Sequence, residues 1–325
     1  MGSNPMNLKQ ILKRSAGIVR LYETVSRVGN LIRGQMYDSV WSIGIVSGED
    51  LLGVSSTVPR AMLKAADVTD VAALFVADPF LIYHAQTASW ILFFEVLNKI
   101  SGRGEIGMAE SADTFNWTYR EIVLRESCHL SYPYVFHSDG EYYMIPESQG
   151  KNSVRLYKAK PFPTKWEYVD DLLFGDSYAD TSIVWKDGYW WLFSYISGKM
   201  ELRLWYSKKI GGPWTEHPFS PIRHGSVKWT RPGGRIVEYS GNLLRFAQDG
   251  TKTYGGSLWV FLIEKLTPEE YREVLYVDRP LLEGTGRGWN AAGMHHLDLH
   301  ENSLTNGFIA AVDGHQSRRK FLGRA

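Results

Sequence analysis

The sequence predicts an all-β protein, a five-bladed β-propeller with an N-terminal amphipathic helix. Three observations lead to this prediction. A β-hairpin pattern occurs in altered copies, the copies start about 50 residues apart, and each is followed by further short strands. Units of this length with four short strands are typical of propeller blades. A β-sandwich with coincidental spacing is the alternative fold.

The repeating unit is clearest in residues 179–195, ADTSIVWKDGYWWLFSY. Two apolar and aromatic strands flank Lys186-Asp187-Gly188, a turn whose glycine supplies a positive φ. Residues 131–147 repeat this layout, and residues 77–95 repeat it with a longer turn. A fourth unit is expected to start at Arg231, and a fifth, weaker unit near His295 and His296.

The second half of each unit supplies the outer strands. These are expected at residues 104–111, 153–159, 201–207 and 257–263. The first three are followed by connections that contain tryptophan, whereas the fourth is followed by LTPEEYREV, which we expect to be helical or irregular. The strand at residues 41–46 is expected to close the ring by joining the last blade.

The predicted domain organisation places a vector remnant and a helical segment in residues 1–40, and a single propeller domain in residues 41–325. Residues 7–34 carry apolar side chains at helical spacing among basic ones. We expect this helix to pack on the propeller; contact with a membrane surface is the less favoured alternative. No signal-peptide core or membrane-spanning apolar stretch is present, so a cytoplasmic location is the default expectation.

The charge balance argues against a nucleic-acid partner. Lys and Arg total 36 against 35 Asp and Glu, which gives a formal charge of +1. The 12 Trp and 18 Tyr are explained by a β core or by stacking against sugar rings. Cys128 is the only cysteine, so no intramolecular disulfide forms. No pattern indicates a cofactor.

Propeller geometry predicts where a site lies. The first strand of each blade lines the axis, and the end of the second strand returns beside its start. Polar and aromatic side chains at these positions should therefore converge at one end of the axis. The strand starts are Asp78, Tyr132, Asp180, Arg231 and one of His295 and His296; the hairpin ends are Glu95, Glu147, Tyr195 and Gln248, with Asp249 beside it.

Each of these residues also has a purely structural interpretation. Asp180 can cap a turn, and Glu147 can pair with Arg231. The glycines between Arg231 and Arg235 either let backbone approach a ligand or belong to a tight turn. Adjacent residues of a strand point in opposite directions, so only one of His295 and His296 should face the site, and we expect no metal centre there. Convergence of unlike polar groups favours a functional site.

These motifs resemble two families. Ala77-Asp78-Pro79 and Asp180 resemble the first-strand acids of the five-bladed glycosidase superfamily, which includes arabinanases, β-xylosidases, levansucrases and invertases. A resemblance over nearly the whole propeller rests on HLSYPYVF, EYYMIPES, GPW, RPGGR, the AQD and YG pair, and GMHH. These segments are similar to the propeller domain of glucosamine inositolphosphorylceramide transferases and their bacterial relatives.

The glycosidase resemblance implies that Asp78 is a base or nucleophile and Asp180 an orienting carboxylate. It also implies a glutamic acid at the start of the fourth blade, where this sequence has Arg231, which cannot deliver a proton. Either Glu147 or Glu95 replaces that acid, or an activated donor needs none.

Three functions stay open at this point. The first is glycosyl transfer from a phosphate-activated donor such as a nucleotide sugar, with Asp78, Asp180 and Glu147 at the sugar and Arg231, Arg235 and a histidine at the phosphate. The second is glycoside hydrolysis by Asp78 and Glu147. The third is non-catalytic carbohydrate binding.

Overall fold

A computed structural model of the chain describes residues 37–49, 51–53, 60–302 and 307–319. The predicted N-terminal helix, and with it most of the segment predicted for residues 1–40, lies outside these residues. The chain divides into two units, one of Trp41–Gln316 and one of Met1–Val40 with Ser317–Ala325. The larger unit is described below. Among the described residues, no helix has both the length and the apolar character needed to cross a membrane.

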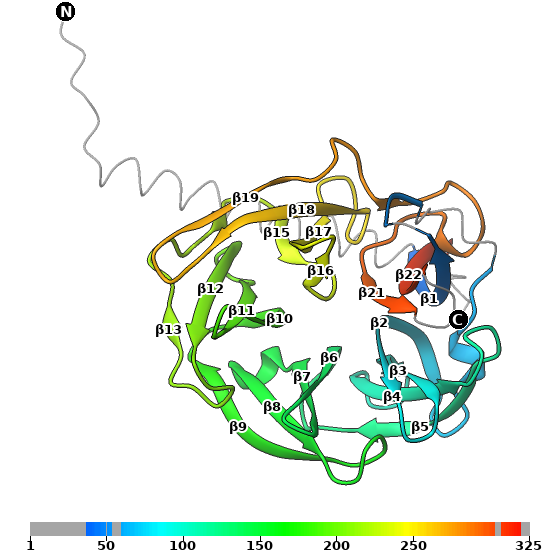
Figure 1. Cartoon of the computed structure of the whole chain (residues 1–325). Coiled ribbons are helices and arrows are strands. Elements are labelled where there is room, and N and C mark those ends of the chain that lie inside the picture. Colours follow the sequence, from blue (N-terminus) through cyan, green and yellow to red (C-terminus); the bar gives the residue numbers. More distant parts are fainter. Residues whose placement is uncertain (1–36, 50, 54–59, 303–306, 320–325) are drawn as a thin grey trace, which may run out of the picture. The chain divides into compact units, whose positions relative to one another are not determined.

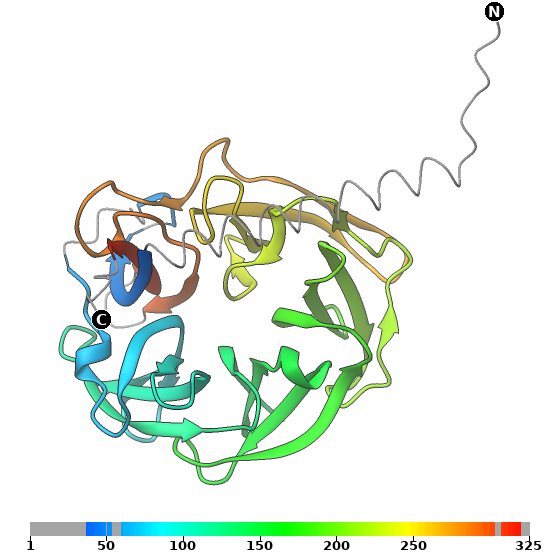
Figure 2. The same cartoon turned by 180° about the vertical axis from the view of Figure 1, so that it is seen from behind.

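Five antiparallel sheets are arranged as blades around one axis, which confirms the predicted five-bladed propeller (Figure 1). Figure 2 shows the same ring from behind. The strands of the first two blades run from the axis to the rim in chain order. Blade I consists of β2 (Ala73–His84), β3 (Ser89–Asn98), β4 (Gly104–Ser111) and β5 (Thr118–Leu124); blade II consists of β6 (Ser131–Ser138), β7 (Glu141–Glu147), β8 (Ser153–Ala159) and β9 (Trp166–Phe174).

The next two blades have additional short strands. Blade III consists of β10 (Tyr178–Lys186), β11 (Tyr189–Ile196), β12 (Glu201–Ser207), β13 (Thr215–Glu216) and β14 (Arg223–His224). Blade IV consists of β15 (Lys228–Pro232), β16 (Val237–Tyr239), β17 (Asn242–Asp249), β18 (Ser257–Leu266), β19 (Tyr271–Leu275) and β20 (Leu282–Glu283). Short 3-10 turns are η1 (Leu51–Gly53), η2 (Ala65–Asp67), η3 (Gln149–Lys151) and η4 (Gly288–Asn290).

Blade V joins the two ends of the ring. It consists of β21 (Leu297–Asn302), β22 (Gly307–Arg319) and β1 (Tyr37–Gly48), in the order β1-β22-β21. The early strand predicted at residues 41–46 therefore pairs with the last strand of the chain, as expected. Ile43 on β1 is fully buried and also exchanges backbone hydrogen bonds with Leu63.

The hydrophobic core lies between neighbouring blades. The middle strand of a blade is covered on both faces, so it is apolar almost continuously; in β3 only one residue, Leu97, is not buried. One cluster joins Ile43 of β1 and Ile309 of β22 with Val76 and Leu92 of blade I. The apolar runs of the sequence therefore hold the blades to one another, and this contact keeps the ring closed.

One expected element is different in the structure. The segment LTPEEYREV was expected to be helical or irregular, but it contains a turn at Thr267–Glu270 followed by strand β19. Tyr271 and Val274 favour a strand, and β19 pairs with β18 along the outer edge of blade IV. Pairing to an existing sheet edge outweighs the helical tendency of the glutamates.

Ring closure through β1 leads to a stability prediction. Ile43→Ala should lower the free energy of unfolding by about 2–5 kcal/mol, because it leaves a cavity between blades V and I. Ile100→Ala is the matched control, since Ile100 is 87% exposed, and it should change stability by less than about 0.5 kcal/mol. Equal midpoints for the two variants in urea unfolding would contradict the role of β1 in closing the ring.

Candidate functional site

The inner strands of blades I, II and III share a backbone irregularity at one end of the axis. Asp78, Tyr132 and Asp180 have positive φ angles of 52°, 46° and 46°, and each lies in a β-bulge where the pairing register shifts. A positive φ in a residue other than glycine costs on the order of 1–3 kcal/mol and persists only where the surrounding structure holds it. The predicted equivalence of these three positions is therefore visible in the backbone.

A carboxyl group of the preceding blade binds the backbone N–H of each of these residues. The N–H of Asp78 donates to Asp313 Oδ2 at 3.1 Å, and that of Tyr132 donates to Asp78 Oδ2 at 3.2 Å. The N–H of Asp180 donates to Glu147 Oε2 at 3.1 Å. These bonds satisfy the N–H groups that the bulges remove from the sheet ladder, and they link the acids from blade to blade.

Asp180 is an ionised member of the site. Arg231 donates to it from Nε and, at 3.2 Å, from Nη2 to Oδ1, and Gln248 Nε2 donates to Oδ2 at 2.8 Å. Burial opposes the charge of Asp180, but the Arg231 guanidinium outweighs burial and holds the pKa of this carboxyl below its ordinary value. Asp180 is thus a fixed negative charge.

The pKa values of Glu147 and Asp78 are shifted in the opposite direction, above their ordinary values. Burial and the charge of Asp180 raise the pKa of Glu147 well above its ordinary value, although Arg231 Nη2 lies 3.3 Å from Glu147 Oε2. Burial is also the main cause that raises the pKa of Asp78. Neighbouring carboxyls whose pKa values are pushed apart are the usual arrangement of an acid and a base in a catalytic site.

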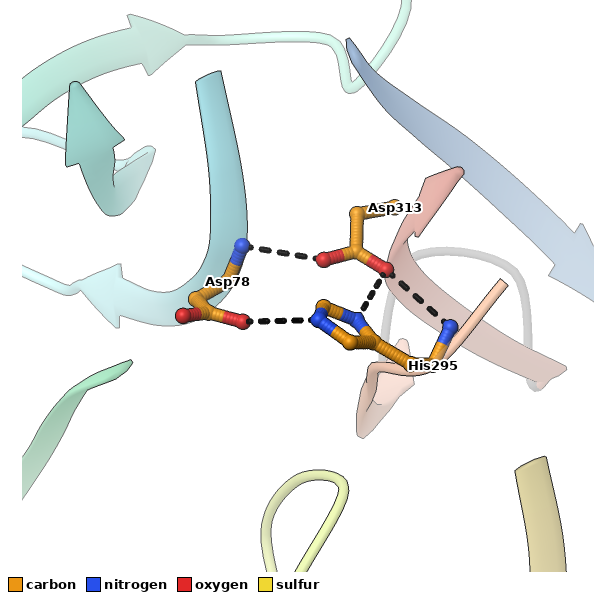
Figure 3. Close-up of side chains that lie close together, drawn as sticks. All are labelled: Asp78, His295 and Asp313. Carbon is orange, nitrogen blue, oxygen red and sulfur yellow. Dashed lines mark hydrogen bonds and ion pairs between the residues drawn. The ribbon is translucent and has the colours of Figure 1, made fainter. Parts of the chain in front are cut away.

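His295 links Asp78 to Asp313 (Figure 3). Its Nδ1 lies 2.9 Å from Asp313 Oδ1, and its Nε2 lies 3.8 Å from Asp78 Oδ1. Burial lowers the pKa of His295, but the carboxylate of Asp313 outweighs burial and raises it above the ordinary value. Nδ1 is therefore held by Asp313, and Nε2 faces the carboxyl group of Asp78.

The adjacent histidine has a different environment. His296 Nε2 lies 2.9 Å from the carbonyl oxygen of Pro79, and burial lowers the pKa of His296 to about 4. Its Nδ1 is 4.0 Å from Asp78 Oδ1. Both rings thus border Asp78, but only His295 is held by a carboxylate. We name Asp78, Glu147, Asp180, Arg231, Gln248, His295 and Asp313 the axial cluster.

The other predicted site residues lie around the axial cluster. The Tyr132 hydroxyl is 2.8 Å from Ser182 Oγ and from the backbone N of Gly234, so it ties blades II, III and IV together. Glu95 Oε1 is 3.1 Å from His129 Nε2. Tyr195 pairs with Ala179 at the end of the blade III hairpin.

Arg235 forms its hydrogen bonds with protein groups outside the axial cluster. Its Nε donates to Asp298 Oδ1 at 2.7 Å, and its Nη2 donates to the carbonyl oxygen of Val135 at 2.8 Å. Gly234, which precedes it, lies against the backbone of Leu297. A Cβ on Gly234 would lie 1.8 Å from the carbonyl oxygen of Leu297, so no side chain fits there. This close approach joins blade IV to blade V.

The alignment of blade IV needs a correction. Trp229, with a φ of 69°, occupies the bulge position that the sequence comparison assigned to Arg231. Lys228 pairs with Asp249 and Pro232 with Ala247, so three residues oppose Gln248 where the other blades have two opposing one. Because of this additional residue, the alignment of the repeats placed the bulge of blade IV at the wrong residue. Asp249 rather than Gln248 is the counterpart of Glu147, and its Oδ1 binds Thr251.

Two residues of the site were not predicted. Asp313 lies within β22, the return strand of the fifth unit, in VDG. Like Glu147, it binds the backbone N–H of the bulge residue in the next blade, but the fifth repeat is too weak in the sequence to reveal this equivalence. Tyr254 is 52% exposed, and its ring lies 5.5 Å from the Arg231 guanidinium and 5.5 Å from the His295 ring. The sequence indicates the YG pair that contains Tyr254 only as part of the family resemblance, without a role in the site.

Three side chains of the axial cluster bring possible metal-ligand atoms together. Ligand atoms of Asp78, His295 and Asp313 lie within 4.8 Å of one another, which is close enough for a shared cation. Both oxygens of Asp313 and Nδ1 of His295 are already used in hydrogen bonds within the cluster. The expected absence of a metal therefore stays a prediction.

The two histidines should titrate at different pH values. In a ring-proton NMR titration we expect His295 to have a pKa above about 6.5 and His296 a pKa of about 4. Asp313→Asn should lower the pKa of His295, because the charge that stabilises the imidazolium is removed. The stability that protonated His295 contributes is complete below about pH 6.5 and is lost as the pH rises through its folded pKa. An unchanged pKa in Asp313→Asn would show that Asp313 does not hold this proton.

Comparison with solved structures shows the fold. An exo-β-1,3-galactanase from Clostridium thermocellum matches 81% of this chain and 63% of its own with a TM-score of 0.55 at 14% identity. A family 117 glycoside hydrolase from Zobellia galactanivorans matches 86% of this chain and 92% of its own with a TM-score of 0.52 at 13% identity. At these identities the likeness concerns the propeller alone.

Comparison of sequences shows the family. The family profile described as "Glucosamine inositolphosphorylceramide transferase 1, N-terminal" matches residues 53–315. The protein named glucosamine inositolphosphorylceramide transferase 1 is 38% identical over 300 residues in Oryza sativa subsp. japonica and 34% identical over 303 residues in Arabidopsis thaliana. Each match covers 84% of this chain but only 40% and 39% of those relatives. The chain therefore belongs to the family of the N-terminal domain of glucosamine inositolphosphorylceramide transferase 1.

Proposed function

We propose that this chain is a carbohydrate-active enzyme that transfers a glycosyl group at the axial cluster. One observation carries the proposal: the carboxyls of Asp78 and Asp180, which are buried, and of Glu147, which is partly buried, come from adjacent blades and lie against Arg231 and His295. The pKa directions of these carboxyls fit this geometry. Asp78 and Glu147 are raised, and Asp180 is lowered. Buried acids with this division are costly to stability and are typical of sites that move protons.

The roles follow from the contacts. Asp78 takes the proton of the acceptor hydroxyl. His295, which is held by Asp313, then takes this proton from Asp78. Asp180 is an ionised carboxylate, so it stabilises the positive charge that develops on a sugar ring as the glycosidic bond breaks. Glu147 is a second carboxyl, whose raised pKa favours its protonated form. Arg231 keeps Asp180 ionised and does not itself donate a proton.

A phosphate-activated donor, such as a nucleotide sugar, is proposed as the glycosyl source. The relatives are named as transferases, and this chain matches about two fifths of their length. A phosphate leaving group departs as an anion, so the absence of an acid at Arg231 does not obstruct the reaction. The contacts of Arg231 and Arg235 favour carboxylate partners over a phosphate clamp, so their assignment to phosphate stays a prediction. The cytoplasmic location and the domain boundary at residue 40 also stay predictions.

Hydrolysis is the second candidate, with Asp78 and Glu147 as the pair of carboxyl groups at the glycosidic bond. The two reactions differ in their substrates. Product from nucleotide sugars and a glycoside acceptor supports transfer, whereas product from aryl glycosides without a phosphate-linked donor supports hydrolysis. Ligand binding without product in both assays supports a non-catalytic carbohydrate-binding domain.

A substitution at Asp78 tests the proposed centre. In whichever assay gives product, Asp78→Asn should lower kcat by about 10²- to 10⁴-fold, because the amide cannot exchange the proton. Asp187→Asn, in the exposed hairpin turn of blade III, is the matched control and should leave kcat unchanged. Unchanged kcat in Asp78→Asn, with a folded protein by circular dichroism, would remove Asp78 from the chemistry.

A further inference from the structure

A cavity of about 450 Å³ lies in blade IV, beside the axial cluster. Its lining includes Lys228, Asp249, Lys252, Ser257, Trp259 and Ala292. The loop between β17 and β18 forms the boundary between the two regions. Residues 251–253 of this loop line the cavity, whereas Tyr254 contacts Arg231 and His295 of the axial cluster. The volume is within the range of roughly 300–1,000 Å³ that is usual for small-molecule sites.

Lys228 is held by two indole rings. Its Nζ lies 4.2 Å from the centroid of the Trp229 ring and 5.4 Å from that of Trp259, and the two rings meet edge to face at 5.2 Å. Cation–π contact fixes the ammonium without neutralising its charge. Trp229 does this from a positive φ of 69°, a conformation that is rare for a bulky residue and therefore indicates a local functional constraint.

The cavity lining carries the ammonium groups of Lys228 and Lys252 and the carboxylates of Asp249 and Glu283. Across the described ranges of the chain, neither Lys228 nor Lys252 lies within ion-pair distance of a carboxylate. Asp249 Oδ1 accepts hydrogen bonds from the backbone N and Oγ1 of Thr251, at 2.9 Å and 2.6 Å, and this fixes its carboxylate at the cavity wall. A fixed carboxylate and two ammonium groups that form no ion pair in the described part of the chain thus line the same small volume.

We infer that this cavity binds a sugar that carries an anionic group, either a phosphate or a carboxylate. The Trp259 ring offers a surface on which a sugar ring stacks, and Asp249 and Ser257 offer partners for ring hydroxyls. Lys228 and Lys252 supply the positive charge that the anionic group requires. This site is separate from the proton-exchanging groups of the axial cluster, so the inference does not depend on the proposed reaction.

The test is a calorimetric titration of the full chain with four probes: glucose 6-phosphate, glucuronate, glucose and inorganic phosphate. Glucose 6-phosphate or glucuronate should bind, and the one that binds identifies the anionic group. Glucose and phosphate alone should bind at least about tenfold more weakly, because each lacks one half of the recognised chemistry. Binding of none of the four, or equal binding of phosphate or glucose, overturns the inference.

Variants locate the binding site. Lys228→Gln should weaken binding of the anionic sugar at least about tenfold, and the matched control Lys265→Gln, on the same strand as Trp259 but outside the cavity, should leave it unchanged. If Lys228→Gln fails to fold by thermal unfolding, Lys252→Gln on the exposed loop replaces it. Unchanged binding in the folded lysine variant, or loss of binding in Asp78→Asn alone, overturns the inference and leaves the proposed transfer reaction untouched.

Discussion

The backbone N–H of a bulge residue, bound by a carboxyl oxygen of the preceding blade, is the interaction on which the candidate site depends. It occurs at Asp78, Tyr132 and Asp180, where positive φ angles take the N–H out of the sheet. Each of these hydrogen bonds satisfies a buried N–H group and so offsets part of the backbone strain. The carboxyl that caps one blade is at the same time a member of the site. The acids are therefore in place only when the ring is closed and each blade meets its neighbour.

Electrostatics then differentiates side chains that the repeat makes equivalent. Asp78 and Asp180 occupy the same position in blades I and III, yet their pKa values move in opposite directions. The difference is Arg231, which comes from the irregular first strand of blade IV and forms its ion pair with Asp180 but not with Asp78. On the other side of the axis, Asp313 holds the imidazole of His295 toward Asp78. One fold position thus becomes a fixed charge in one blade and a proton-exchanging group in another.

Blade IV contains most departures from the repeat. Its bulge has one more residue than the others, Trp229 has a positive φ, and Gly234 approaches the backbone of Leu297 too closely for any side chain. Local rules are broken in natural proteins mainly where function requires it. Both the guanidinium of the axial cluster and the lysine held between two indole rings come from this blade, within four residues of each other in the chain. The same irregular strand therefore serves two neighbouring sites.

The sequence by itself determined the blade count, the outer strands at residues 104–111, 153–159 and 201–207, and the equivalence of Asp78 with Asp180. These depend on local pattern: alternation in strands, glycine in turns and a repeat of about 50 residues. Only the tertiary structure decided that Asp313 belongs to the site, that Trp229 and not Arg231 occupies the fourth bulge, and that residues 271–275 form a strand. Each of these depends on which residue of one strand faces which residue of another. A bulge changes that register by one residue, and a partner from a distant blade sets the charge of an acid, so neither is written in a local pattern.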